Sequence, residues 1–427
     1  MARVRVPRPA GGGRAEGGGG APAREPPAEA LEAAFAAAAA ELAAAKSGLD
    51  GIRDYPQLAR SLDLYGGLRR RKVTNATLKF RELLAEPGAG LLSGSEGAGG
   101  AGGEGAAREV RAFCNAELPG AFVAELIRHC RRAGRPLDWV ASSFVGAGGA
   151  GGAGGAGAAG AAGAAGAAGG AGAAAGGGAA GGGAAGAAGA AGTADAPLGD
   201  DLGLVRAHPD RWLMAAAGTT GDLTDPAEVE ALAAAVRRRW PGGATLCTGD
   251  AGLGVENDWN RAEEAHTRLQ FGQALCALLA LAPGGVALLK HFTFSTPASR
   301  GLITALALCF DEVELVKPLT SRPLNSEVFL LCRGFQGLAP EDLAWLRAWH
   351  AGTPPPSGDP ARRVAPALPG TEAALLAAAQ ALGRRQARHL AEAARLGALP
   401  PGARGEAVPP AARAAAERAW RRATAGV

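Results

Sequence analysis

The sequence has few residues that could build a metal site or a disulfide framework. Its six cysteines are dispersed along 427 residues, and no Cys-x-x-Cys pair occurs among them. Structural zinc sites usually draw two ligands from such a pair, so the spacing disfavours a metal centre. Because most of the cysteines lie within apolar runs, we predict buried free thiols and an intracellular, reducing compartment, either cytoplasm or nucleus.

Long hydrophobic runs are also missing. Once the Gly/Ala tracts are set aside, no apolar stretch reaches the roughly 18 residues that a membrane span needs, so we expect no membrane association. The N-terminus lacks the apolar core of a secretory signal, yet its first fourteen residues hold four arginines and no acid. An organelle transit peptide therefore stays open beside the alternative of a disordered basic leader.

Glycine and alanine dominate what is present. The chain has 68 glycines and a net charge of +4, which permits a polyanionic partner without requiring one. Long Gly/Ala tracts offer no side chains that could anchor a core. We predict a disordered basic leader (1–27), a helical segment (28–66), a main domain (67–336) with a flexible insertion (146–195), and a helical, basic C-terminal extension (337–427).

Strand-like and helix-like segments alternate outside those tracts. The predicted strands cover 110–114, 137–144, 244–248, 285–292, 313–317 and 328–332. The predicted helices cover 28–46, 119–131, 227–239, 257–282, 297–310, 340–352 and 371–396. This alternation predicts an α/β fold with a mostly parallel, doubly wound sheet and helices on both faces. We expect the last strand to pair antiparallel near the sheet edge.

The first predicted strand leads into a helix through Glu117-Leu118-Pro119-Gly120. Small residues let the backbone approach a ligand, and a helix N-terminus offers free N–H groups, so the turn suits a nucleotide-type cofactor. It contains neither G-x-G-x-x-G nor G-x-x-x-x-G-K, which disfavours a dinucleotide and excludes a P-loop. An ordinary strand-to-helix connection remains the alternative.

Asp222 is a second candidate for a cofactor contact. It lies just before the predicted helix 227–239, where its carboxylate could accept from the exocyclic amine of an adenine. The alternative is a helix N-cap, a role that Thr224 or Asp225 could also fill, with Pro226 as the first helical residue.

Two lysines and two acidic residues stand at positions where such a sheet usually has its active site. Asp250, Lys290 and Glu327 follow or flank predicted strands, and Lys79 ends the run Thr-Asn-Ala-Thr-Leu-Lys. In α/β sheets, ligands bind beyond the carboxyl ends of the strands. Each residue also has a structural alternative: a solvated helix face for Lys79, a turn for Asp250, and an edge-strand charge for Glu327.

With these residues in view, the chain resembles the FtsJ-like ribose 2′-O-methyltransferase family. It is most similar to the cap-type (adrift-like) branch found in large nucleocytoplasmic DNA viruses. The resemblance rests on blocks that span about 67–335 in the family's order: Thr74-Asn75-Ala76-x-x-Lys79, Phe113-Cys114-Asn115-x-Glu117-Leu118-Pro119-Gly120, Trp139-Val140-Ala141-Ser142-Ser143, Trp212-Leu213-Met214, Gly221-Asp222-x-Thr224, Thr248-x-Asp250, Leu269-x-Phe271-Gly272-Gln273, Leu289-Lys290-His291 and Ser321-Arg322-Pro323-x-Asn325-Ser326-Glu327.

This resemblance implies a Rossmann-like methyltransferase fold that uses S-adenosylmethionine. It implies a catalytic tetrad, which by matching motif is Lys79, Asp250, Lys290 and Glu327. It also implies cofactor contacts from Glu117, Pro119, Gly120, Ala121 and Asp222, and no metal. The family turn is usually Pro-Gly-Gly, so Ala121 would weaken cofactor binding if its position required a positive φ.

Methyl transfer to a ribose hydroxyl needs a group that takes the hydroxyl proton. A lysine does this only if its pKa falls through burial or a neighbouring cation. We expect both burial and Lys79 to lower the pKa of Lys290, which would make Lys290 the base or the hydroxyl-orienting group. Asp250 and Glu327 would orient the ammonium groups or the ribose.

The acceptor implied by the resemblance is RNA, because only RNA carries that hydroxyl. Capped messenger RNA is the first expectation, and ribosomal or transfer RNA is the second. The candidate phosphate contacts are Arg69, Arg70, Arg71, Lys72 and Arg322. From residue 384 onward the sequence has nine arginines and three glutamates. This excess of positive charge suits either phosphate contact or a solvated surface. A catalytically silent methyltransferase fold that binds RNA is the alternative from a different class.

Overall fold

The computed structural model describes residues 2–7, 28–49, 52, 54–69, 73–85, 92, 109–144, 200–214, 219–252, 262–352, 369–399 and 408–425. The predicted insertion at 146–195 lies outside the described residues, and so do Arg70, Arg71 and Lys72.

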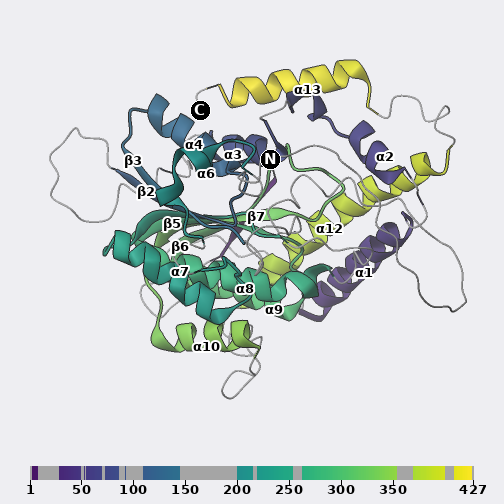
Figure 1. Cartoon of the computed structure of the whole chain (residues 1–427). Helices are drawn as coiled ribbons and strands as arrows, with labels where there is room; N and C mark the ends of the chain where they lie inside the picture. The colour runs from purple at the N-terminus through teal and green to yellow at the C-terminus, as the bar shows by residue number, and fades with distance from the viewer. Residues whose placement is uncertain are drawn as a thin grey trace, which may run out of the picture.

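A seven-stranded sheet with the order β1-β6-β7-β5-β4-β2-β3 forms the centre of the molecule (Figure 1). Its strands are β1 (Ala2–Val6), β2 (Val110–Asn115), β3 (Leu137–Ala141), β4 (Ala244–Gly249), β5 (Leu281–His291), β6 (Phe310–Lys317) and β7 (Val328–Phe335). Five strands run in one direction, whereas β7 and β1 run opposite to them. The predicted α/β fold with a mostly parallel sheet is therefore confirmed.

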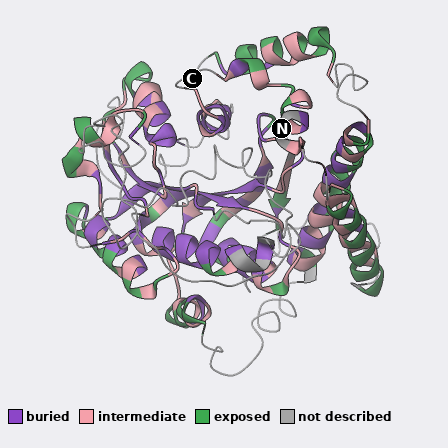
Figure 2. Ribbon diagram, turned by 45° about the vertical axis from the view of Figure 1, so that its right-hand side comes forward, coloured by how far each residue is buried: buried purple, intermediate pink, exposed green. Residues whose placement is uncertain are grey.

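Helices cover both faces of the sheet (Figure 1). One face carries α3 (Asn75–Leu84), α4 (Ala121–Arg132) and the short α6 (Leu204–Ala207), and the other carries α7 (Pro226–Arg239), α8 (Ala262–Ala280) and α9 (Pro297–Cys309). Each layer buries its own apolar cluster against the strands, and the buried residues follow the sheet and the inward helix faces (Figure 2). A further helix, α10 (Pro340–Ala351), packs outside α7 and α8.

Residues 2–6 correct the first part of the predicted disordered leader (1–27); residues 8–27 lie outside the described residues. Ala2–Val6 forms β1, which pairs antiparallel with β6 at the edge of the sheet. Valines and arginines alternate along β1: Val6 joins the core, while the Arg3 guanidinium lies 3.1 Å from the Glu314 carboxylate of β6. This period of two suits a half-buried strand, and the polar composition of the whole segment concealed it.

The placement of β7 near the sheet edge is also wrong, although its antiparallel direction is confirmed. It lies between β5 and β6, and β1 extends the sheet further. All of its residues except Gly334 are buried, as expected for a strand covered on both faces.

Helices from the two ends of the chain pack beside the sheet. Helix α1 (Ala28–Ser47) lies along α12 (Pro369–Gly397), which also contacts α2 (Tyr55–Ser61), α9 and β1 (Figure 1). Helix α13 (Pro410–Ala423) buries Trp420 against Leu68 and Leu78. No helix in the described part of the chain has the length and apolar character needed to cross a bilayer.

All six cysteines are free and buried, which confirms the prediction of buried thiols. Burial raises the pKa of each of them, for example to about 12 for Cys276 and about 11 for Cys130. Thiols of this kind remain protonated and pack as small apolar groups.

Candidate active site

Lys79 reaches the sheet because α3 begins with a capping box. Thr74 and Thr77 exchange side-chain hydrogen bonds with each other's backbone N–H groups, which fixes the first turn. Phe80 then stacks on Phe122 of α4 at 4.3 Å between ring centroids. With α3 held this way, the Lys79 side chain is only 4% exposed, so the alternative of a solvated helix face is wrong.

The other three candidate residues meet at one edge of the sheet. Asp250 follows β4 and Lys290 lies near the end of the parallel neighbour β5, while Glu327 directly precedes β7. Because β7 runs antiparallel to β5, its beginning lies at the same edge as the ends of β4 and β5. The topology therefore gathers residues that are far apart in the sequence.

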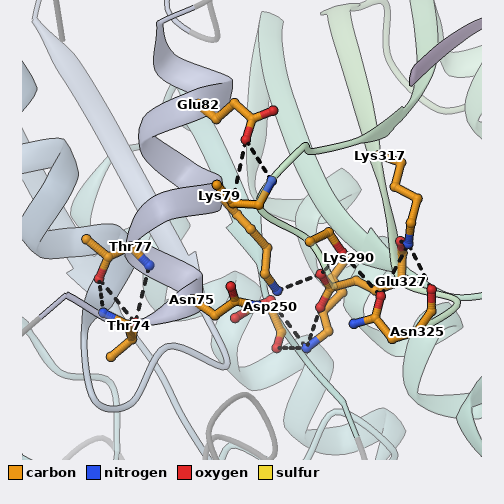
Figure 3. A network of polar contacts seen from close by, with 12 residues as sticks. Thr74, Asn75, Thr77, Lys79, Glu82, Asp250, Lys290, Lys317, Asn325 and Glu327 are labelled. Carbon is orange, nitrogen blue, oxygen red and sulfur yellow. Dashed lines mark hydrogen bonds and ion pairs between the residues drawn. The ribbon is translucent and has the colours of Figure 1, made fainter. Parts of the chain in front are cut away.

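The four side chains alternate in charge and contact one another (Figure 3). Lys79 Nζ lies 2.5 Å from Glu327 Oε1, and Lys290 Nζ lies 3.8 Å from Glu327 Oε2. Lys290 Nζ also lies 3.3 Å from Asp250 Oδ1. The resulting row, Lys79–Glu327–Lys290–Asp250, is closed to solvent at Glu327 and slightly open at Asp250, whose side chain is 16% exposed.

Gln273 of α8 joins the two parallel strand ends beneath this row. Its Oε1 accepts from the N–H of Ala251 at 2.9 Å, and its Nε2 donates to the carbonyl of Lys290 at 3.0 Å. The amide thereby fixes the backbone on both sides of the Lys290–Asp250 pair. Sequence reasoning placed Gln273 in a family block without assigning it this role.

The electrostatics of the row differ from the expectation at Lys290. Burial acts to lower the pKa of Lys290, but the Asp250 and Glu327 carboxylates outweigh it and the pKa is raised. The predicted lowering is therefore wrong, because it counted burial and Lys79 but not the two carboxylates. At Glu327, burial acts to raise the pKa, yet Lys79 and then Lys290 hold it at about 2. Both lysines face an ionised carboxylate at neutral pH.

The predicted cofactor turn lies next to this row. The N–H of Asp250 donates to the carbonyl of Asn115 at 3.3 Å, which joins the ends of β4 and β2. Glu117 is buried in the turn, and its Oε1 accepts from the N–H groups of Phe122 and Val123 at 2.6 and 3.1 Å. Burial raises the pKa of Glu117 to about 8, and Asp250 adds to this effect. Glu117 thus acts as a cap for α4.

Gly120 provides the sharp change of direction into α4. It has a φ of 99° as the N-cap of the helix, while Ala121 is the first helical residue. A positive φ is thus required at Gly120, the glycine that this turn retains, and not at Ala121. The replacement of the second glycine by Ala121 therefore leaves the backbone of the turn intact. Pro119 precedes Gly120 within the same turn.

Asp222 approaches this turn from a separate loop. Gly221 has a φ of 73°, and a Cβ there would collide with the backbone carbonyl of Ser143, at the end of β3. Asp222 Oδ1 accepts from the N–H and the hydroxyl of Thr224 at 2.9 and 2.7 Å. The N-cap of α7 is Asp225, so the alternative of a helix cap does not account for Asp222.

The part of the chain that holds β4, β5, β6 and β7 decides the family. Residues 202–335 match the model of the FtsJ-like methyltransferase family. The chain contains an FtsJ-like methyltransferase domain. This agrees with the resemblance inferred from the sequence blocks.

Relatives of the FtsJ-like domain come from viruses and eukaryotes. The chain is 29% identical over 293 residues to "Probable methyltransferase EP424R" of African swine fever virus (isolate Warthog/Namibia/Wart80/1980), a match that covers 64% of this chain and 54% of the viral protein. It is 41% identical over 117 residues to "Cap-specific mRNA (nucleoside-2'-O-)-methyltransferase 1" of Danio rerio, covering 27% of this chain and 14% of that protein. A protein with the same name from Trypanosoma cruzi (strain CL Brener) is 41% identical over 120 residues, covering 28% of this chain and 32% of that protein. The chain thus spans about half the length of its viral relative.

Polar groups suited to S-adenosylmethionine lie at the end of β2 and in the loop of Asp222. The amide nitrogen of Asn115 is buried at the end of β2 and has no hydrogen-bond partner among the described residues. It is a donor available to a ligand beside the turn at Gly120, and the half-buried Asp222 carboxylate is an acceptor on the opposite loop. These residues fit a cofactor that carries amine and carboxylate groups.

A cavity of about 570 Å³ adjoins the tetrad near Glu327. It is lined by α1, α12, the segment after Lys290 and the β6–β7 connection, and its aromatic side chains are Phe35, Tyr65, Phe292 and Phe294. Ser321 also lines the cavity, and its hydroxyl donates to Glu327 Oε1 at 3.1 Å. These rings come from separate segments of the chain, so no local sequence motif marks the cavity.

Two of the predicted RNA contacts, Arg69 and Arg322, lie within the described residues. Arg69 forms an ion pair with Asp63 and donates to Asn75 Oδ1 at 2.9 Å, so it supports the start of α3. Arg322 is half-buried in the β6–β7 connection, and burial, followed by Arg69, lowers its pKa. A cation that lies near another cation is a suitable place for a phosphate.

Proposed function

We propose that the chain is an S-adenosylmethionine-dependent ribose 2′-O-methyltransferase that acts on cap-adjacent nucleotides of messenger RNA. The observation that carries this proposal is the buried row Lys79–Glu327–Lys290–Asp250 at the carboxyl edge of the sheet, between the cofactor turn and the cavity. Buried charges are costly to maintain unless they serve a role, and such groups cluster at active sites.

The tetrad has the groups that the transfer requires. When bound, S-adenosylmethionine supplies a methyl group already activated on a sulfonium. The enzyme must hold the acceptor oxygen in line and remove its proton. Asp250 and Glu327 raise the pKa of Lys290 and so favour its ammonium form, which orients the acceptor hydroxyl; Lys290 takes the hydroxyl proton from the minor population in which it is neutral. Lys79 balances Glu327, which keeps that carboxylate ionised beside Lys290.

The assignment to capped RNA rests on two supports. The relatives from Danio rerio and Trypanosoma cruzi carry names that specify cap-specific mRNA methylation. The aromatic cavity beside Glu327 offers stacking surfaces for a base next to the acceptor ribose. Arg322 lies in the β6–β7 connection between Ser321 and Pro323, which line the cavity, and could contact a phosphate of the same RNA.

A radiolabelled methyl-transfer assay on capped and uncapped RNA tests the proposal. The wild type should label capped RNA, and digestion should locate the label on the ribose of a cap-adjacent nucleotide. Lys290→Ala should lower kcat by about 10²- to 10⁴-fold, because it removes the proton acceptor. Lys46→Ala, a change of the same kind on α1, should retain wild-type activity.

Two results would contradict the proposal in different ways. Failure of the wild type to bind S-adenosylmethionine in a calorimetric titration would favour a catalytically silent RNA-binding module. Preference for uncapped ribosomal or transfer RNA would preserve the chemistry but change the acceptor.

A further inference from the structure

A third lysine, partly buried, lies beside the tetrad. Lys317 ends β6, and its ammonium donates to the carbonyl of Glu327 at 2.7 Å. It also donates to the carbonyl and the side-chain oxygen of Asn325, at 2.9 and 3.2 Å. All three acceptors belong to the same short segment, which runs directly into Glu327 (Figure 3).

This segment is part of the β6–β7 connection, residues 318–327. Glu82 of α3 secures the first half, because its carboxylate accepts from the N–H groups of Leu319 and Thr320 at 2.6 and 3.2 Å. Lys317 fixes the second half through its hydrogen bonds to the carbonyls of Asn325 and Glu327. The connection contains no regular helix or strand. Hydrogen bonds to the charged side chains of Glu82 and Lys317 therefore satisfy backbone groups that a helix or strand would otherwise pair.

The contact with Glu327 bears directly on the geometry of the tetrad. Lys317 holds the carbonyl of Glu327, and the carboxylate of the same residue reaches Lys79 at 2.5 Å and Lys290 at 3.8 Å. Ser321 adds a hydrogen bond to that carboxylate but none to its backbone. A shift of the Glu327 backbone would alter both ion pairs at once, and displacements of about 1 Å are enough to impair catalysis strongly.

We propose that Lys317 is a positioning residue of the methyl-transfer reaction, whose ammonium fixes the backbone of Asn325 and Glu327 so that the Glu327 carboxylate spans Lys79 and Lys290. The proposal rests on the proposed function, since it assigns a role within the same tetrad. Lys317 acts through Glu327 and does not itself contact the reacting atoms.

The charges around Lys317 make this contact sensitive to pH. Burial lowers the pKa of Lys317 to about 8, Lys79 from α3 and Arg385 from α12 add to the lowering, and the Glu327 carboxylate opposes it. His389 of α12 is a further titratable group close enough to interact with Lys317. An ammonium has three N–H donors for its three acceptors, whereas the neutral amine has only two. Above pH 8, one of the three hydrogen bonds is therefore lost.

The test compares Lys317→Met and Lys317→Arg with the wild type and with Lys46→Met as a control on α1. We expect Lys317→Met to lower kcat roughly 10- to 100-fold while the Kd of S-adenosylmethionine changes less than twofold. Lys317→Arg keeps the cation and should recover a substantial part of kcat. Lys46→Met should behave as the wild type.

The pH profile separates positioning from a general loss of structure. In the wild type, log kcat should rise with pH as Lys290 loses its proton, then bend near pH 8 as Lys317 titrates. In Lys317→Arg the bend should move above pH 10, because the guanidinium stays charged. In Lys317→Met the bend should disappear.

The outcomes distinguish the two proposals. An active wild type whose Lys317→Met variant retains its kcat would overturn the positioning role alone, and so would a bend that stays near pH 8 in Lys317→Arg. If Lys317→Met does not fold, Lys317→Arg and its pH profile still decide the question. A wild type that binds S-adenosylmethionine but transfers no methyl group would overturn both proposals.

Discussion

Among single residues, Glu327 is the one whose negative charge offsets both buried lysines of the site. Its carboxylate faces the ammonium groups of Lys79 and Lys290, and all three side chains are nearly inaccessible to solvent. Its pKa of about 2 lies below the ordinary 4.5, so Glu327 stabilises the fold above pH 4.5. This contribution declines as the pH falls from 4.5 toward 2, because the folded state must then accept a proton that it disfavours.

Glu327→Gln should therefore destabilise the fold and abolish methyl transfer. The neutral amide leaves two buried ammonium groups without a shared counter-charge, at an expected cost of about 3–5 kcal/mol. Urea unfolding at pH 7 measures the loss. The double variant Lys79→Met/Glu327→Gln should be less destabilised than the sum of its single changes, and strict additivity in this cycle would contradict the coupling.

The identities of the four tetrad residues were accessible from the sequence, but their electrostatics were not. Lys79, Asp250, Lys290 and Glu327 stand in short blocks whose order carries the family resemblance. The direction of the Lys290 pKa depends on how closely two carboxylates approach it, which only the folded distances decide. Lys317 was missed for a related reason: its partners are mostly backbone carbonyls, which have no signature in the sequence.

At the scale of elements, α4 depends on a carboxyl group that is not part of the helix. Glu117 accepts from two N–H groups of the first turn, and Gly120 supplies the N-cap conformation without a side chain. The pKa of Glu117 is raised from 4.5 to about 8, so the folded state holds the proton more tightly than the unfolded state does. The stabilising effect is therefore complete below pH 4.5. The effect declines as the pH rises toward 8.

Glu117→Ala should cost about 0.5–2 kcal/mol of stability, the range for loss of a helix cap. Glu117→Gln retains an oxygen acceptor and should cost less than Glu117→Ala at pH 7. Thermal unfolding of both variants between pH 5 and pH 9 checks this, and the glutamine variant should lack the wild-type decline toward pH 8. Equal losses in the two variants would show that the N–H contacts contribute little.

Element types followed from the sequence more readily than element positions in the sheet. The alternation of strands and helices predicted the layered architecture because periodicity is a local property. The interior position of β7 depends on β6 and β1, and the pairing partner of Ala2–Val6 lies more than 300 residues away. Long-range pairing of this kind cannot be derived from the composition of a short polar segment.

At the scale of the whole molecule, the C-terminal helix α13 is tied to the helix that presents Lys79. Trp420 is buried beside Leu68 and Leu78, and its indole N–H donates to Glu82 at 3.4 Å. Glu82 in turn holds the β6–β7 connection. The C-terminal extension thus supports the active-site framework in addition to its basic surface.

Trp420→Ala should destabilise the protein by about 3–5 kcal/mol, the usual cost of emptying a buried aromatic site. Trp420→Phe preserves most of the ring and should cost less. Hydrogen exchange should show loss of protection in α3 and in the β6–β7 connection as well as in α13. Loss of protection restricted to α13 would mean that the extension folds independently of the site.

The pairing of β1 with β6 also constrains the order in which the molecule can be completed. Ala2 lies opposite Lys317 in the sheet, so β1 acquires its partner only after the more than 300 residues that separate it from β6 have been synthesised. Until then β1 has no partner, and an unpaired strand exposes its backbone N–H and C=O groups to other chains. Once paired, β1 covers the edge of β6 and becomes the edge strand itself, where its short length and its two arginines disfavour edge-to-edge association.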